Sequence, residues 1–118
     1  MALGTTERLA EFATSLTLGD IPDSVRDSTK ILLLDALACA LAGHQGEETG
    51  QLTAMAAALG QSDESTVMGS SDGLSLAGAT LLNGYLITAV TMCDVHRSTL
   101  THITPEVVPP ALAIAERD

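Results

Sequence analysis

The chain has 118 residues and a formal net charge of −10, with fifteen Asp and Glu against five Lys and Arg. This length is typical of one domain, and apolar residues at 46% are enough for a core. Aromatic residues at 2% and so few cations disfavour nucleic acid and anionic membranes, which need clustered positive charge. The composition therefore predicts a core of small aliphatic side chains.

The start of the chain and its apolar segments predict a soluble, cytoplasmic protein. Residues 1–13, MALGTTERLAEFA, lack the basic and long apolar regions of a secretory signal. The most apolar stretch, residues 31–42, is too short to span a bilayer and contains Asp35. Cys39 and Cys93 lie within apolar helical patterns, so we expect buried, reduced thiols.

Apolar residues at intervals of three and four predict two helices in the first third of the chain. The first covers residues 5–18, with Thr5 or Thr6 as its N-cap. The second runs from 22 to 42 and ends at Gly43. Its first half is charged and its second half is apolar on every side, which predicts burial over most of its circumference.

The middle of the chain predicts two more helices separated by a polar segment. The third helix covers residues 47–59, with Gly60 as its C-terminal stop. Residues 65–68 form a short strand or an extended link. The fourth helix, over residues 74–92, is almost wholly apolar and must be buried.

An irregular, histidine-bearing loop over residues 93–104 precedes the last predicted helix. That helix begins near Pro105, and Pro109 and Pro110 kink or delay it. The whole reads as a single all-α domain, a bundle of about five helices of which two are buried. Because three shorter helices cannot cover two long apolar ones, we expect apolar surface left for another copy or another polypeptide.

Charged and polar side chains of catalytic type concentrate directly after the fourth predicted helix. Five of them occur within ten residues: Cys93, Asp94, His96, Arg97 and His102. One interpretation is a loop held at the mouth of a pocket by a rigid element. In the other, Asp94 caps the turn between helix and loop and both histidines are solvated. These residues alone leave both open.

The residue types of this loop also suggest metal binding and nucleophilic catalysis. Zinc has the candidate ligands Cys93, Asp94, His96 and His102. Their order does not match the usual paired spacing, so we expect no metal. A nucleophile among Ser98, Thr99 and Cys93 needs an adjacent base and an oxyanion hole, and no motif predicts either.

Three other polar side chains lie outside the loop. Asp35, inside a helix expected to be buried, must be satisfied by a neighbouring helix end or subunit, or act directly in catalysis. His44, just past Gly43, is expected to be an exposed loop residue. Asn83, inside an apolar helix, is expected to make a packing hydrogen bond.

Several segments occur in the order found in one enzyme family. They are residues 33–43 (LLDALACALAG), 65–69 (STVMG), 83–84 (NG), 93–97 (CDVHR), His102 and 109–116 (PPALAIAE). Together they resemble the amino-terminal part of the MmgE/PrpD superfamily of 2-methylcitrate dehydratases and cis-aconitate decarboxylases. The resemblance implies a largely helical domain joined to a smaller α/β lid, usually in a homodimer. It also implies cofactor-free elimination, decarboxylation or epimerisation of small di- and tricarboxylic acids.

The resemblance also suggests site residues. Asp94 matches the later Asp of the family motif, and His102 or His96 matches the family histidine. Thr91 stands at the earlier Asp, and Pro105 replaces the Pro that directly follows the histidine. In this reading a histidine is the base and Asp94 orients its imidazole. The expected substrate-binding residues are Arg97, Thr99 and Thr101.

The resemblance covers only part of a family member, because members are several times longer. Arg97 alone is too little positive charge for two or three carboxylates, so the site needs cations from a partner chain. We therefore expect a fragment or small subunit of a split lyase, completed by a complementary subunit. The alternatives are a non-catalytic helical module that assembles with or regulates a larger relative, and a dehydratase for carrier-bound acyl or polyketide substrates.

Overall fold

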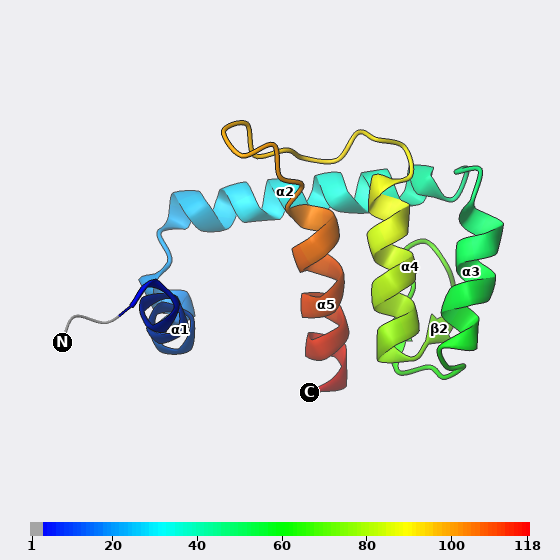
Figure 1. Ribbon diagram of the computed structural model, residues 1–118, viewed down its shortest axis with the longest axis horizontal. Helices are drawn as coiled ribbons and strands as arrows, with labels where there is room; N and C mark the ends of the chain where they lie inside the picture. The colour runs from blue at the N-terminus through cyan, green and yellow to red at the C-terminus, as the bar shows by residue number, and fades with distance from the viewer. Residues whose placement is uncertain (1–3) are drawn as a thin grey trace. The chain divides into compact units, whose positions relative to one another are not determined.

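The computed structural model describes residues 4–118 and contains mainly helices (Figure 1). Its elements are α1 (Thr5–Ser15), the 3-10 helix η1 (Leu18–Asp20), α2 (Asp23–Gly43), α3 (Thr49–Ala58), β1 (Ser65–Thr66), β2 (Gly73–Leu74), α4 (Leu76–Thr88) and α5 (Thr104–Arg117). The predicted all-α class with five α-helices is confirmed for these residues. The chain divides into two compact units, Met1–Lys30 and Ile31–Asp118.

The first unit contains α1, η1 and the start of α2. The N-cap of α1 is Gly4, not Thr5 or Thr6, and the Glu7 carboxylate accepts the Gly4 N–H. A carboxylate in the first turn satisfies a backbone donor that the helix leaves free. No side chain of α1 is buried, and Phe12 on its apolar stripe is 61% exposed.

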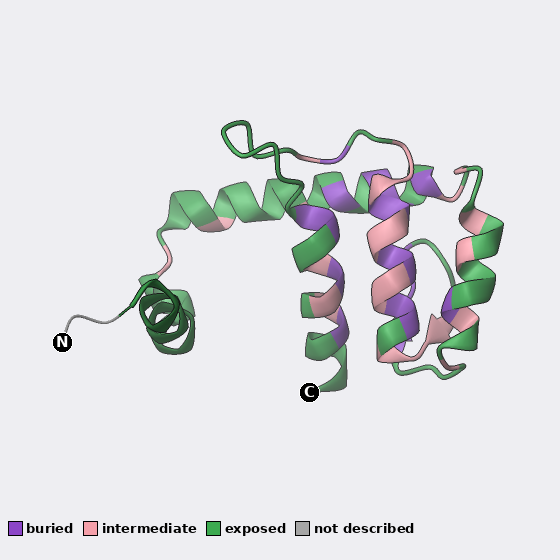
Figure 2. Ribbon diagram, viewed as in Figure 1, coloured by how far each residue is buried: buried purple, intermediate pink, exposed green. Residues whose placement is uncertain are grey.

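The second unit is built around α4. This helix lies between α3 and α5 and packs against both (Figure 1). It is buried or half-buried along most of its length, whereas α5 is buried on one side only (Figure 2). The prediction of a buried helix in this segment is confirmed.

A short antiparallel hairpin contacts α4 and α5. In it Ser65 pairs with Leu74 and Thr66 with Gly73. Of the two alternatives left open for residues 65–68, the short strand forms, over Ser65–Thr66 only, and its partner β2 is an addition to the prediction. The Thr66 N–H donates to the carboxylate of Glu116 at 2.7 Å, which ties the hairpin to the end of α5.

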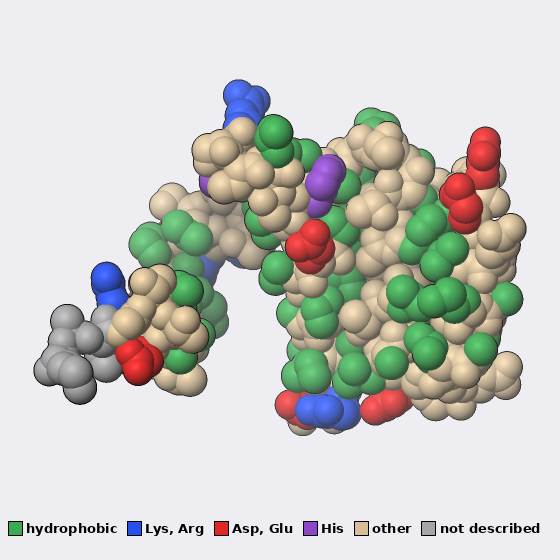
Figure 3. Space-filling view, viewed as in Figure 1, with side chains coloured by type: hydrophobic (Ala, Val, Ile, Leu, Met, Phe, Trp, Pro, Cys, Tyr) green, Lys and Arg blue, Asp and Glu red, His purple; other side chains and the backbone are tan. Residues whose placement is uncertain are grey.

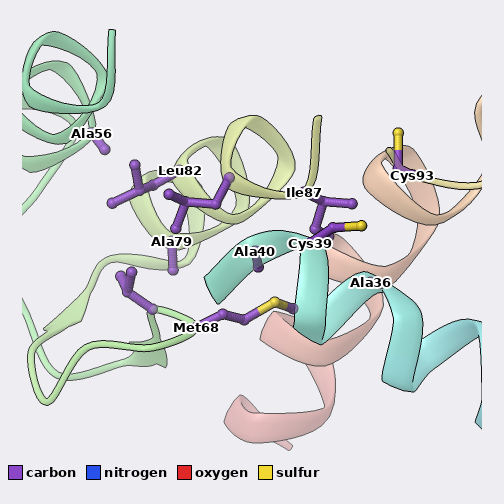
Figure 4. Packing of buried hydrophobic residues seen from close by; sticks show 11 residues of the cluster. Ala36, Cys39, Ala40, Ala56, Met68, Ala79, Leu82, Ile87 and Cys93 are labelled. Atoms are coloured by element: carbon purple, nitrogen blue, oxygen red, sulfur yellow. The ribbon is translucent and has the colours of Figure 1, made fainter. Parts of the chain in front are cut away.

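The core consists of small and aliphatic side chains, as the composition predicts (Figure 4). Its buried members are Ala36, Cys39, Ala40, Ala56, Val67, Met68, Ala79, Leu82, Leu86, Ile87 and Cys93. Two glycines permit close helix contacts. A Cβ on Gly43 would lie 2.0 Å from the Leu86 carbonyl oxygen, and one on Gly78 would lie 2.6 Å from that of Ala56. The end of α2 and the backbone of α3 therefore approach α4 too closely for any side chain between them.

The part of α2 in the second unit is buried along one stripe only. Ala36, Cys39, Ala40 and Gly43 are its buried residues. Ile31, Leu34 and Leu41 are 69%, 67% and 59% exposed. Of the two helices predicted to be buried, only α4 is buried on most sides. The prediction is wrong for α2, which leaves an apolar face exposed. In the view of Figure 3, hydrophobic side chains are also exposed over α3, α4 and α5, with few charged ones between them.

The fourth helix is shorter than its apolar pattern suggests, because it ends at Thr88 and not Met92. Thr91 adopts a positive φ of 50°, and its N–H donates to the Thr88 carbonyl oxygen at 2.8 Å. A left-handed residue ends a helix by turning the chain away from its axis. Apolar residues continue past this point, so their spacing alone misplaces the helix end.

The last helix begins where expected, with Pro105 in its first turn. Proline is tolerated there because the first N–H groups have no partner within the helix. Pro109 and Pro110 lie inside a helix that already starts at Thr104, so they do not delay it. Pro109 is fully buried and packs this helix into the second unit.

Candidate functional site

The loop between α4 and α5, residues 89–103, folds back on itself as a tight hairpin. The His96 N–H donates to the Thr101 carbonyl oxygen at 2.9 Å, and the two residues form an isolated β-bridge. Leu100, at the tip, has a φ of 53° and is 78% exposed. Three expected substrate-binding residues are exposed on this hairpin: Arg97, Thr99 and Thr101.

Asp94 connects the loop to α5. Its carboxylate accepts the Thr104 N–H at 3.1 Å and also the Thr104 hydroxyl. Thr104 is the first residue of α5 and is 3% exposed, so Asp94 satisfies a buried donor at the positive end of a helix. Among the hydrogen bonds of residues 4–118, none joins Asp94 to His96 or His102. Asp94 therefore acts as a cap, but at the start of α5 and not at the turn from α4 into the loop, where the sequence interpretation placed it.

His96 is exposed and bonded within the hairpin. Its Nδ1 lies 2.9 Å from the Thr99 hydroxyl oxygen and 3.2 Å from that of Ser98. A hydroxyl both donates and accepts, so these contacts suit either tautomer of the ring. They also occupy the Thr99 hydroxyl, which a substrate would have to share.

His102 is also exposed, but it has other contacts. Its Nδ1 is 3.3 Å from the Sγ of the buried Cys93. His102 also lines a groove of about 460 Å³ between α4 and the start of α5. The other lining residues are Thr80, Leu81, Gly84, Tyr85, Thr88, Pro105 and Glu106. Of the six expected site residues, His102 is the one that lines this groove.

Sequence reasoning missed the groove residues contributed by α4. Thr80, Gly84 and Thr88 follow each other at intervals of four, which places them on one face of a helix. A Cβ on Gly84 would lie 3.2 Å from the Pro105 carbonyl oxygen, so a small residue is needed where α5 begins. This run of small and hydroxylated residues in an apolar helix was the available signal. Tyr85, which lies beside them, donates its hydroxyl to Glu48 at 3.1 Å.

Asp35 does not have the environment that the sequence predicts. Its side chain is exposed, and no hydrogen bond of the described residues satisfies its carboxylate. It lines a cavity of about 150 Å³ together with Ala38, Cys39, Ala42, Val90 and Met92. The expectation that it must be satisfied inside a buried helix is therefore wrong for this chain by itself.

His44 and Asn83 both hold the segment after β1. His44 is half-buried, with Nε2 2.7 Å from the Met68 carbonyl oxygen, so the expectation of an exposed loop residue is wrong. Asn83 is buried; its carboxamide accepts the Met68 N–H at 2.8 Å and donates to the Thr66 carbonyl oxygen at 2.9 Å. The predicted packing hydrogen bond of Asn83 is confirmed, and the side chain makes two such bonds.

Both thiols are free and buried, as predicted. Burial raises the pKa of the Cys93 thiol, and the nearby negative charge of Asp94 adds to the effect. Burial and Asp35 do the same to the pKa of Cys39. Neither thiol is thus a thiolate nucleophile near neutral pH.

The zinc interpretation has no geometric support in the residues described. Within residues 4–118, no three His, Cys, Asp or Glu side chains are grouped so that they could hold a metal ion. Of the four side chains considered, Cys93 and His102 contact each other, while Asp94 and His96 have other partners. Over the same residues, no helix has the length and apolar character needed to cross a membrane.

Comparison with known proteins decides the family. The chain matches the MmgE/PrpD N-terminal domain over residues 7–118. It belongs to the MmgE/PrpD family. It is 31% identical over 111 residues to the cis-aconitate decarboxylase-like protein oryM of Aspergillus oryzae, across 94% of the chain. It is 26% identical over 113 residues to a cis-aconitate decarboxylase of Aspergillus terreus, across 96% of the chain.

The MmgE/PrpD resemblance expected from the sequence motifs is thereby confirmed. The chain spans 23% of the length of each of these two relatives. No solved structure matches it.

Proposed function

We propose that this chain forms the amino-terminal part of a cofactor-free lyase for small di- or tricarboxylic acids, with a pocket completed by another polypeptide. The observation that carries the proposal is the position of His102, a candidate for the family histidine, in the groove between α4 and α5. The names of the two relatives add support, since both refer to cis-aconitate decarboxylase.

A second polypeptide is part of the proposal for reasons of charge. A substrate with two or three carboxylates needs positive groups or donors around it, and proton removal adds more negative charge. The groove contains Glu106 and no Lys or Arg side chain. Arg97, the cation of the loop, stands on the exposed hairpin in a chain of net charge −10. The missing positive charge must therefore come from outside these residues.

The proposed roles follow from the positions of the side chains. His102 contacts the substrate in the groove, and His96 is the alternative acid–base group on the hairpin. Arg97, Thr99 and Thr101 supply donors for substrate carboxylates. Asp94 fixes the end of the loop on α5, so that its contribution is mainly to position these groups.

The proposal is tested by complementation. The 118-residue chain is mixed with a separate polypeptide made of the remaining three quarters of the A. oryzae relative. Carbon dioxide release from cis-aconitate and water loss from citrate-like acids are then measured. We expect turnover only with both chains present. His102→Ala should lower turnover, because it removes the side chain proposed to contact the substrate in the groove.

Arginine variants provide a matched control for charge. Arg97→Ala should raise the KM of the assembled enzyme, while Arg8→Ala, also an exposed arginine, should leave it unchanged. An assembled pair whose turnover survives both His102→Ala and His96→Ala would rule out the proposed site.

One observation favours a second candidate, a non-catalytic module that assembles with a larger relative. The Asp94 carboxylate is already occupied by Thr104, and Thr91 stands where the resemblance places an Asp. This candidate predicts tight association with the larger chain. It also predicts an activity of that chain that does not change when Asp94, His96 and His102 are replaced together.

A further inference from the structure

The two ends of the histidine-bearing loop meet through one contact that no family motif explains. Cys93 and His102 are nine residues apart, and the Cys93 Sγ lies 3.3 Å from the His102 Nδ1. The bridge between His96 and Thr101 closes the hairpin between them and so brings both side chains together. Cys93 is 7% exposed and belongs to the core cluster, whereas His102 is exposed and lines the groove.

The chemistry of the two groups indicates which one donates the hydrogen bond and which one accepts it. An imidazole nitrogen is a good acceptor, whereas a thiol sulfur is a weak one, so S–H to nitrogen is the stronger pairing. The thiol also keeps its proton, because burial and Asp94 raise the pKa of Cys93. A neutral imidazole has one N–H. If Nδ1 accepts from the thiol, the ring proton is on Nε2.

We propose that Cys93 is a positioning residue that holds the proton of His102 on Nε2, so that the ring offers an N–H donor to an anionic ligand in the groove. The ligand class rests on the proposed function, whereas the state of the ring does not. Within residues 4–118, Nε2 of His102 has no hydrogen-bond partner, so it is the nitrogen left for a ligand. The Thr88 hydroxyl, which lines the same groove, already donates to the Gly84 carbonyl oxygen at 3.2 Å and to that of Tyr85 at 3.0 Å.

In this arrangement His102 and His96 have different roles. A ring with its proton on Nε2 donates a hydrogen bond to a carboxylate oxygen of the ligand and cannot accept a proton at that nitrogen. His102 therefore binds the substrate as a donor, and the base of the reaction is another group. His96, whose Nδ1 contacts two hydroxyls on the hairpin, carries no such constraint.

The first test is ¹⁵N NMR of the histidine rings in the 118-residue chain, above the pH at which they become neutral. We expect His102 almost entirely with the proton on Nε2. Cys93→Val, which removes the donor, should give a mixture of tautomers, and Cys93→Ser should restore the single form. Cys39→Val, the matched loss of a buried thiol, should change nothing. A proton on Nδ1, or equal tautomer ratios in the chain and Cys93→Val, would overturn the proposal.

The second test observes the thiol itself and remains decisive if Cys93→Val fails to fold. In the Cys39→Val chain, the infrared S–H stretching band belongs to Cys93 alone, since the chain has two cysteines. It should lie at lower wavenumber than the Cys39 band measured in Cys93→Ser, and His102→Phe should raise it. An unchanged band in His102→Phe would contradict the contact. Both tests need no turnover, so failure of the lyase proposal is seen separately.

Discussion

The helix α4 and the loop that follows it are neighbours in the chain but are held in place by different forces. In α4, Leu86 and Ile87 are fully buried, and helices on both sides exclude water. In the loop of residues 89–103, most side chains are exposed, and a few polar contacts set its shape, such as that of Asp94 with Thr104. The side chains suited to chemistry thus stand on the less constrained of the two segments, which is joined to α4 at one end and to α5 at the other.

The largest expected effect comes from the core of α4. Leu86→Ala should lower the free energy of unfolding by about 2 to 5 kcal/mol, because the side chain is fully buried. Leu100→Ala, at the 78% exposed tip of the loop, should change it by less than about 0.5 kcal/mol. Urea unfolding of both variants measures the difference, and equal losses would refute the contrast between helix and loop.

The second largest loss of stability is expected from the replacement of Asn83, a buried polar residue of α4. Asn83→Ala leaves the buried Met68 N–H and the Thr66 carbonyl oxygen without their partner. An unsatisfied buried donor such as the Met68 N–H costs about 1 to 3 kcal/mol, so the variant should be destabilised by about that much. Gln61→Ala, an exposed carboxamide, is the control. Thermal unfolding that fails to separate the two variants would mean that Asn83 does not hold the hairpin.

The anchor of the loop should have a smaller effect. Asp94→Ala removes the acceptor at the first turn of α5, which typically costs about 0.5 to 2 kcal/mol. Asp94→Asn keeps an oxygen for the Thr104 N–H and should cost less. If the assembled enzyme loses activity far beyond this loss of stability in Asp94→Asn, the carboxylate acts in the reaction and not only as a cap.

Backbone strain at the junction of helix and loop should be relieved by substitution. Thr91 has a φ of 50°, which is unfavourable for a β-branched residue. Thr91→Asn should raise the free energy of unfolding by up to about 1 kcal/mol, because Asn tolerates the left-handed region. Thr101→Asn, also exposed in the loop but without a positive φ, should give no gain. A gain of equal size in both would show that strain is not the cause.

The smallest expected effect is a decrease in the free energy of unfolding as the pH becomes alkaline. Folding raises the pKa of both thiols above the ordinary value of 9.0. The folded state therefore keeps its full stability below that pH and loses part of it as the pH rises toward the folded pKa. Unfolding of the chain and of Cys93→Ser between pH 8 and 10 measures this loss. It should be smaller in the variant, and parallel curves would contradict the raised pKa of Cys93.

The scaffold was predictable from the sequence because burial imposes a period on apolar residues. That period identified the five α-helices of residues 4–118, and the composition predicted their small-residue core. The period failed at Thr91, where a local backbone conformation ends α4 while the apolar pattern continues. It also failed at Asp35, since a helix that is apolar all round was assumed to have neighbours on every side.

The candidate site was predictable in its residue types but not in its contacts. The density of polar side chains after a buried helix located the loop. The pairing of Cys93 with His102 depends on how residues 96 to 101 fold back, and no spacing rule describes that. The groove beside His102 depends on small residues of α4, such as Gly84, whose role becomes visible only when α5 is in place.

The contact between Glu116 and Thr66 bears on self-assembly. Both strands of a two-stranded sheet are edges, and an edge with free N–H groups can recruit a strand from another molecule. Here the carboxylate takes the outward N–H of β1 and puts negative charge where an incoming strand would have to dock. The β1 edge of the hairpin is thus protected against intermolecular β-pairing.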